Sequence, residues 1–325
     1  MPGFTTHYIF GMKAYNDMPF TPLKHTIAKY RWLYQLGLQG PDMFFYNIPI
    51  LRHRDYRNVG SYMHEHKVNA FFDCCLRRIG TIRSRQQQEE AISYLAGFMN
   101  HYIADSICHP YVYGRIGYPV DAPTSMHHGM HAHLENELDA ILLWKYKKKK
   151  PSEFNQTATI CLNGQEIQFI SHFLASCINE TYYPITYRNN FQVTPAMVHR
   201  SIWALRFGCR TLSDKNGKKK FGIAQVESIF VNHPVASAKM VTDSVTDYRS
   251  SCNLNHEAWG NPWDPTRVST ASFVDLFHET LDKCSRVYAL LNSAVTDNMP
   301  LDKQDLSPLL AELGNESYHS GLPVE

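Results

Sequence analysis

Apolar residues recur at steps of three and four along most of the chain, the spacing that places them on one face of an α-helix. The most apolar stretch of this kind carries Ile92, Leu95, Met99 and Ile103. Further apolar residues on its other faces indicate a helix that is buried most of the way round. Pro110 follows and predicts the end of this helix.

The same periodicity predicts helices through the rest of the chain. Their expected ranges are about 5–16, 25–36, 60–80, 126–144, 165–182, 195–212, 221–248 and 269–293. Thr5 or Thr6 is the expected N-cap of the first helix. A loop is expected over residues 253–265, and the residues from about 302 onward are expected to be loosely attached. With little sign of strands, the pattern predicts an all-α, multi-helix bundle.

The bulk composition narrows the class of protein. A net charge of +2 argues against a protein that binds a phosphate backbone through a strongly basic surface. The eight cysteines form no Cys-x-x-Cys pair and no framework spacing, which is typical of reduced thiols in a cytosol. The N-terminus has no signal-peptide pattern, and no run approaches the ~20 apolar residues of a membrane span. We therefore expect a cytoplasmic protein.

Histidine is the unusual component of this composition. The chain has 17 histidines, most of them in its first part, between His7 and His133. His101, Asp105 and His109 are each four residues apart, so they share one face of the buried helix. Unpaired polar groups in a core are costly. Either a metal ion binds this column, or three core residues are satisfied separately.

Four further segments offer nitrogen and oxygen ligands. His7 lies in the first turn of its helix, and Asp42 follows Gly-Pro and precedes an aromatic run. An Asp in that position commonly caps a turn, but it can also point inward and seek a cation. His64 shares the buried side of its predicted helix. His131 and Glu135 are one turn apart on a helix, a spacing that can hold one metal ion.

These eight residues contain no thiolate, and they are too many for one tetrahedral ion. The set therefore predicts two or three zinc ions, with a carboxylate bridging a pair. The neighbouring residues His128, His133 and Glu137 are expected to lie on a solvated face. The histidine-rich residues 1–150 are expected to form a metal-binding helical core, and residues 151–325 a helical extension packed on it, within one continuous domain.

The motifs together resemble a known family. The column His101-x-x-x-Asp105-x-x-x-His109, with Thr6-His7, Gly40-Pro41-Asp42 and His131-x-x-x-Glu135, is similar to the zinc-dependent phospholipase C family. Relatives of that family include the catalytic domain of glycosylphosphatidylinositol-specific phospholipase D and single-strand nucleases. The matched motifs span about residues 1–145, and the resemblance implies an all-helical fold that holds three zinc ions.

The resemblance also implies a distribution of ligands. One zinc would be held by Asp42, His64 and His101, a second by His7 with Asp105 as the bridge, and a third by His109, His131 and Glu135. The secreted phospholipases offer an N-terminal Trp to the second zinc, whereas this chain starts Met-Pro-Gly-Phe. The second site is therefore expected to be weaker or differently completed.

These observations predict a zinc-dependent phosphodiester hydrolase of the phospholipase C type, with metal-activated water and Asp42 as the candidate general base. The expected substrate is a phospholipid or another small phosphodiester, with transient contact to a membrane surface and no stable nucleic-acid complex. Two alternatives stay open. One is a single-strand nuclease-type phosphodiesterase, which needs aromatic platforms and a basic groove. The other is a non-catalytic metal-binding scaffold, which the missing Trp favours.

Overall fold

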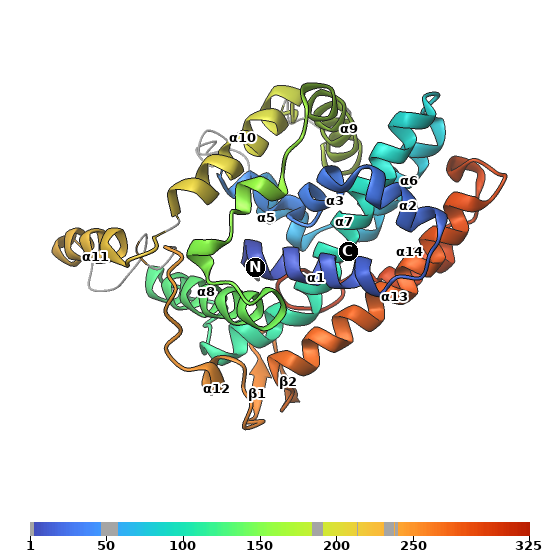
Figure 1. The fold of residues 1–325 in the computed structure, drawn as a ribbon. Helices are drawn as coiled ribbons and strands as arrows, with labels where there is room; N and C mark the ends of the chain where they lie inside the picture. The colour runs from blue at the N-terminus through green and yellow to red at the C-terminus, as the bar shows by residue number, and fades with distance from the viewer. Residues whose placement is uncertain (1–2, 47–57, 184–190, 213, 231–236, 238–239) are drawn as a thin grey trace.

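The computed structural model describes residues 3–46, 58–183, 191–212, 214–230, 237 and 240–325. The fold is all-α, as the sequence predicts (Figure 1). The helices are α1 (Phe4–Asp17), α2 (Pro22–Lys29), α3 (Arg31–Gly37), α5 (Val59–Glu65), α6 (Val68–Thr81), α7 (Arg85–Arg115), α8 (Ser125–Lys147), α9 (Gly164–Tyr182), α10 (Pro195–Leu212), α11 (Lys218–Phe230), α12 (Tyr248–Ser251), α13 (Phe273–Thr296) and α14 (Ser307–Leu313). Within the described residues, some of them are connected by the 3-10 segments η1 (Gly40–Tyr46), η2 (Pro151–Glu153), η3 (Gln156–Thr159) and η5 (Leu301–Lys303).

Helix α7 is the central element, because the other helices pack around it on several sides (Figure 1). Its first half joins a hydrophobic cluster with α2, α3, α6 and α9. Its second half joins another cluster with α1, α8 and the start of α13. The column His101–Asp105–His109 lies where these two clusters meet, which explains why the sequence keeps this helix apolar on its remaining faces.

Two glycines bring α3 unusually close to α7. A Cβ atom on Gly37 would lie 2.1 Å from the Tyr94 carbonyl oxygen, and one on Gly97 would lie 2.1 Å from the Tyr34 carbonyl oxygen. Any side chain at either position would therefore push the helices apart. This close contact fixes the start of η1 against the middle of α7, where the column begins.

The prediction that Pro110 ends the central helix is wrong. Helix α7 continues to Arg115, with Pro110 inside it. An internal proline removes one helical hydrogen bond and disfavours the helix by roughly 3 kcal/mol. Tertiary packing outweighs this cost, because Tyr111 and Val112 are fully buried in the second cluster. The Tyr111 hydroxyl also donates to the Ser251 carbonyl at 2.7 Å.

Several other helix boundaries differ from the sequence-based expectation. The helix expected over 25–36 is two helices that meet at Tyr30, and the one expected over 60–80 is interrupted at Lys67, which has a positive φ of 48°. The helix expected over 221–248 does not extend that far, because residues 240–247 are not helical; α11 covers Lys218–Phe230, and residues 231–236 and 238–239 lie outside the described part of the chain. The expected loop 253–265 contains β1 (Trp259–Asn261), which pairs antiparallel with β2 (Asp264–Ser269).

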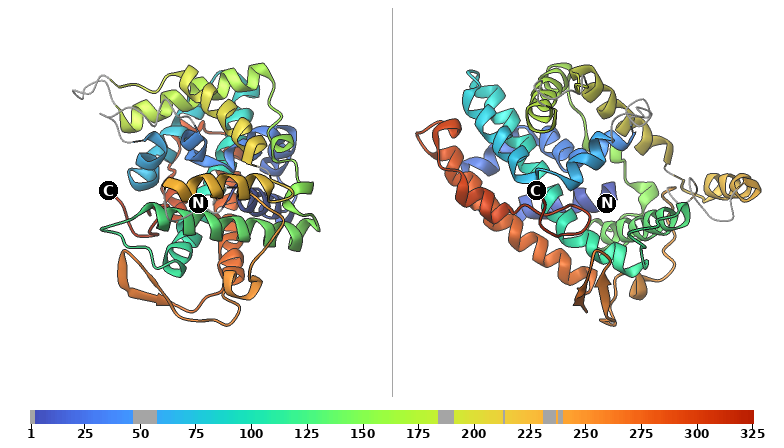
Figure 2. Two further views of the ribbon diagram at one scale, coloured as in Figure 1. Left: turned by 90° about the vertical axis from the view of Figure 1, so that its left-hand side faces the viewer. Right: turned by 180° about the vertical axis from the view of Figure 1, so that it is seen from behind.

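The expectation that residues from about 302 onward are loosely attached is also wrong. Leu306, Leu309 and Leu313 are buried against the rest of the fold. Residues 314–325 then turn back across the molecule toward α5 and α7, as the dark red loop shows (Figure 2). The Tyr318 amide donates to the His64 carbonyl at 2.9 Å, so this C-terminal segment is joined to α5.

Helices from both sides of residue 150 pack on α7, since α1 and α3 precede that residue and α9 and α13 follow it. The division into a core of residues 1–150 and an extension of residues 151–325 stays a prediction. Within the described part of the chain, no helix has both the length and the apolarity needed to cross a membrane.

Candidate metal centre

The column on α7 forms the middle of the candidate site. His101, Asp105 and His109 are all fully buried on one face of the helix. The two carboxylate oxygens of Asp105 approach different histidines of the column. Oδ2 lies 3.1 Å from His101 Nε2, and Oδ1 lies 3.7 Å from His109 Nδ1.

Helix α1 supplies His7, and a residue of α8 fixes where α1 begins. The expected cap at Thr5 or Thr6 is wrong, because α1 begins at Phe4 after Gly3. The carboxylate of Asp139 instead accepts the amides of Thr5 at 3.1 Å and Thr6 at 2.7 Å. This contact satisfies two free amides of the first helical turn and holds His7 Nε2 at 3.1 Å from Asp105 Oδ1. Burial raises the pKa of Asp139 to about 6.

Segment η1 supplies Asp42. The preceding Gly40 has a φ of +46°, and a Cβ atom there would lie 2.2 Å from the ring of His101. A larger residue at position 40 would be strained by the positive φ and would clash with His101. Because residue 40 is glycine, the Gly-Pro-Asp segment can pass directly over the column. Asp42 is buried, and its Oδ1 lies 3.3 Å from His64 Nε2 and 3.8 Å from His101 Nε2. Asp42 therefore points inward, which was one of the two expectations for it.

Helix α8 supplies His131 and Glu135 at the other end of the column. Glu135 Oε1 lies 2.6 Å from His131 Nε2 and 3.6 Å from His109 Nε2. Both side chains are only slightly exposed, at 13% for His131 and 12% for Glu135. The structure thus brings all eight residues predicted from the sequence together in one cluster, in which each residue contacts at least one other.

Hydrogen bonds to backbone carbonyls orient three of these rings. The Nδ1 atom of His64 lies 2.7 Å from the Gly60 carbonyl, and that of His101 lies 3.1 Å from the Leu38 carbonyl. The Nδ1 atom of His109 lies 2.7 Å from the Tyr318 carbonyl. A ring that donates from Nδ1 presents a bare Nε2 lone pair, which is how metal-binding histidines are commonly held.

The charges in the cluster are strongly coupled. Burial alone would raise the pKa of Asp105, but His101 and His7 lower it well below its usual range. Burial lowers the pKa of His7. Burial would do the same for His64, yet the nearby carboxylates of Asp105 and Asp42 raise the pKa of His64 to about 9. A cation that replaced the proton on His64 would meet the same two carboxylates.

The ligand atoms gather in two groups that can each hold a metal ion. Asp42, His64, His101 and Asp105 offer atoms that all lie within 4.8 Å of one another, and so do His109, His131 and Glu135. Within the described residues, Asp42 Oδ1, His64 Nε2, His101 Nε2 and both oxygens of Asp105 have no hydrogen-bond partner although they are buried. Burying so many unpaired polar atoms is costly without a ligand between them.

One residue of the site was missed by the sequence analysis. His319, in the C-terminal segment, stacks on the ring of His64 with centroids 4.9 Å apart and lies 5.6 Å from the ring of His109. Its Nδ1 lies 3.3 Å from the Tyr113 hydroxyl. Burial and His64 lower the pKa of His319 well below its usual value. No spacing in the sequence links residue 319 to the eight predicted residues, so only the fold reveals it.

The prediction that Glu137 lies on a solvated face is wrong. Its side chain is buried, and its carboxylate accepts the Thr246 amide at 2.6 Å and the Ser251 hydroxyl. Glu137 therefore joins α8 to α12 rather than facing water. His133, one turn earlier on the same side, is 49% exposed, in agreement with the expected solvated face.

The fold and the site define an all-helical protein with a buried histidine and carboxylate cluster that can hold metal. A family model described as zinc dependent phospholipase C matches residues 6–186, more than half of the chain. The chain belongs to this family, as the resemblance of its motifs predicts. Comparisons with curated proteins and with solved structures return no match. The match includes all eight predicted residues and leaves out the C-terminal segment with His319.

Proposed function

We propose that the protein is a zinc-dependent phosphodiester hydrolase of the phospholipase C type. The observation that supports this proposal best is the pair of ligand groups, one fully buried and one largely buried, that lie on either side of Asp105 in a chain of this family. All eight side chains offer nitrogen or oxygen, and none offers a thiolate. Such sets are typical of catalytic rather than closed structural zinc sites.

The residues fit zinc in their chemistry. The imidazole Nε2 atoms and carboxylate oxygens that lack partners among the described residues are the donors that zinc prefers. We propose that Asp42, His64 and His101 hold one ion, that His7 and Asp105 hold a second, and that His109, His131 and Glu135 hold a third. Asp105, with one oxygen toward each end of the column, would be shared between ions.

When bound, zinc supplies an activated water near neutral pH and neutralises charge on the phosphate oxygens. Asp42 is the candidate general base and would orient the attacking water, while its Oδ1, which faces His64 and His101, would hold the ion. Asp105 would balance the positive charge of the centre. His319 would contact the phosphate, since its ring lies beside both His64 and His109.

The proposed substrate is a phospholipid or another small phosphodiester, reached through transient contact with a membrane surface. A specific observation favours a second candidate, a single-strand nuclease. The Tyr113 ring lies 4.5 Å from the ring of His131 and 4.9 Å from that of Trp263, and Tyr118 stacks on Trp263 at 5.9 Å. Such aromatic groups beside a metal centre are suited to stacking nucleobases.

A substrate panel separates these proposals. Zinc-loaded protein would be given phosphatidylcholine vesicles, a bis-nitrophenyl phosphodiester and a single-stranded oligonucleotide. A phospholipase C releases a phosphorylated headgroup from the vesicles, whereas a nuclease shortens the oligonucleotide. Trp263→Ala should reduce cleavage of the oligonucleotide but leave cleavage of the other two substrates unchanged. Full zinc content with no cleavage of any of the three would refute hydrolysis and select the non-catalytic metal-binding scaffold.

A further inference from the structure

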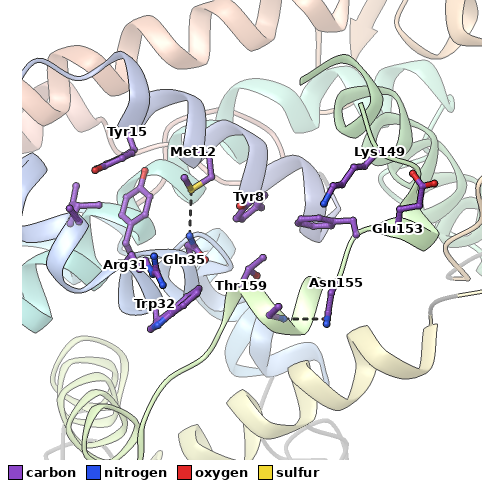
Figure 3. Close-up of a pocket in the computed structure, with 15 residues that line it drawn as sticks. Tyr8, Met12, Tyr15, Arg31, Trp32, Gln35, Lys149, Glu153, Asn155 and Thr159 are labelled. Carbon is purple, nitrogen blue, oxygen red and sulfur yellow. Dashed lines mark hydrogen bonds between the residues drawn. The ribbon is translucent and has the colours of Figure 1, made fainter. Parts of the chain in front are cut away.

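A cavity lies away from the histidine cluster, between α1, α3 and residues 149–159 (Figure 3). Its volume of about 630 Å³ is within the range of small-molecule sites, roughly 300–1,000 Å³. None of the eight cluster residues lines it. Helix α1 separates the two sites, because Tyr8 and Met12 lie about 100–140° around the helix from His7.

Gln35 is a buried polar residue in the lining of this cavity. Gln35 is 7% exposed, and its Oε1 has no hydrogen-bond partner among the described residues. Its Nε2 contacts Met12 Sδ at 3.5 Å, a weak acceptor (Figure 3). Gln35 therefore lines the cavity with an amide that has one unpaired acceptor and one donor bonded only to sulfur. An unpaired buried acceptor is costly. The amide oxygen and nitrogen therefore point to a ligand that carries a hydrogen-bond donor next to an acceptor.

Aromatic side chains form the walls. Tyr8 and Tyr15 project from α1, Trp32 projects from α3, and Phe154 lies 5.2 Å from the Tyr8 ring. The Arg31 guanidinium lies 4.2 Å above the Trp32 ring. Planar side chains of this kind favour a flat ligand that can stack between them.

Charge at the mouth favours an anionic group on that ligand. Arg31 lines the cavity on α3, and Lys149 points toward it from the opposite end (Figure 3). Glu153 also lines the cavity, but its Oε2 already accepts the Lys150 amide at 2.9 Å. The cations therefore outnumber the carboxylate, and Lys149 lies at the end away from Gln35.

We propose that this cavity binds a nucleoside monophosphate. The base would stack between the aromatic walls, with an amino group donating to Gln35 Oε1 and a ring nitrogen accepting from Gln35 Nε2. A glutamine amide pairs with the amino edge of adenine in this way. The phosphate would lie at Lys149. This proposal does not depend on the proposed hydrolase activity.

Calorimetric titration of the zinc-loaded protein with adenosine monophosphate tests the proposal. We expect saturable binding in the millimolar range or tighter. N6,N6-dimethyladenosine monophosphate lacks the N–H donor and should bind about tenfold more weakly. Gln35→Met should weaken adenosine monophosphate by a similar factor and remove the difference between the two ligands.

Variants of two exposed lysines test the phosphate contact. Lys149→Gln should weaken adenosine monophosphate several-fold but leave adenosine unchanged, and Lys145→Gln, on α8 outside the cavity, is the matched control. Asp105→Asn should leave binding intact, because the histidine cluster is a separate site. Three results would each overturn the proposal. They are no saturable binding, an affinity that Gln35→Met and Lys149→Gln leave unchanged, and loss of binding in folded Asp105→Asn protein.

Discussion

Asp105 is the residue on which the proposed centre depends most. It is fully buried, and its two oxygens approach His7 and His101, each at 3.1 Å. Asp105→Asn keeps the size of the side chain but replaces one oxygen with an NH2 group, which cannot bind a cation. One of the two ions proposed to share Asp105 would therefore lose its ligand, and the charge of the side-chain cluster would rise by one unit.

The magnitude follows from this geometry. Residues that only orient a metal ligand change metal affinity by about 10–100-fold when mutated, so a shared ligand should cost at least about 100-fold, or about 2.7 kcal/mol. Loss of one electrostatic stabiliser of a developing charge slows turnover by about 10²–10³-fold. We expect Asp105→Asn to lose at least one zinc and most phosphodiester hydrolysis.

Elemental analysis after gel filtration and hydrolysis of a bis-nitrophenyl phosphodiester measure these two effects. Asp282→Asn is the matched control, because Asp282 is exposed on α13, outside the cluster. Glu137→Gln is unsuitable as a control, since Glu137 is buried. Full zinc content and full activity in Asp105→Asn would show that α7 is not a metal helix, and the proposed function would fail with it.

Three further predictions follow from the same structure. A chelator that strips the metal should lower the thermal midpoint, because the cluster joins helices that would otherwise bury unpaired charges; an unchanged midpoint after proven metal loss would contradict this. His319→Ala should reduce turnover about 100-fold with unchanged zinc content, because its proposed contact is with the phosphate rather than with the ions; full turnover would remove it from the site. Glu137→Gln should destabilise the fold by about 1–3 kcal/mol at pH 7. Burial alone would raise the pKa of Glu137, but hydrogen bonds from Ser251 and Thr246 lower it below the usual value. Its contribution is therefore complete above pH ~4.5 and lost as the pH falls through the lowered pKa; denaturation curves of the two proteins should converge in acid, and a constant gap would refute this cause.

The sequence predicted most of the helices and the faces that they bury, because these follow from local periodicity. The range 195–212 is observed unchanged as α10, and the four-residue spacing on α7 places His101, Asp105 and His109 on one buried face. The sequence analysis also predicted that residues far apart in the chain would meet, because all eight side chains are of the nitrogen and oxygen types that bind zinc. Their roles as metal ligands stay predictions.

What the sequence did not predict depends on tertiary contacts. Pro110 is tolerated inside α7 because its neighbours are buried, which no local rule records. Glu137 looks like a surface residue until Thr246 and Ser251 reach it from more than 100 positions away. His319 has no ligand at a helical spacing, so only the path of the C-terminal segment brings it to the site.

The C-terminal segment also governs when the centre can be made. The Tyr318 amide binds the His64 carbonyl, and the Tyr318 carbonyl binds the His109 ring, so residue 318 joins two parts of the cluster. On a ribosome, the column on α7 emerges some two hundred codons before this residue. A nascent chain would therefore expose its histidines with their orientation incomplete. Metal binding that depends on the finished geometry would have to follow synthesis of the C-terminal segment. The partly synthesised chain, before residue 318 is added, would be the stage most open to binding of the wrong metal.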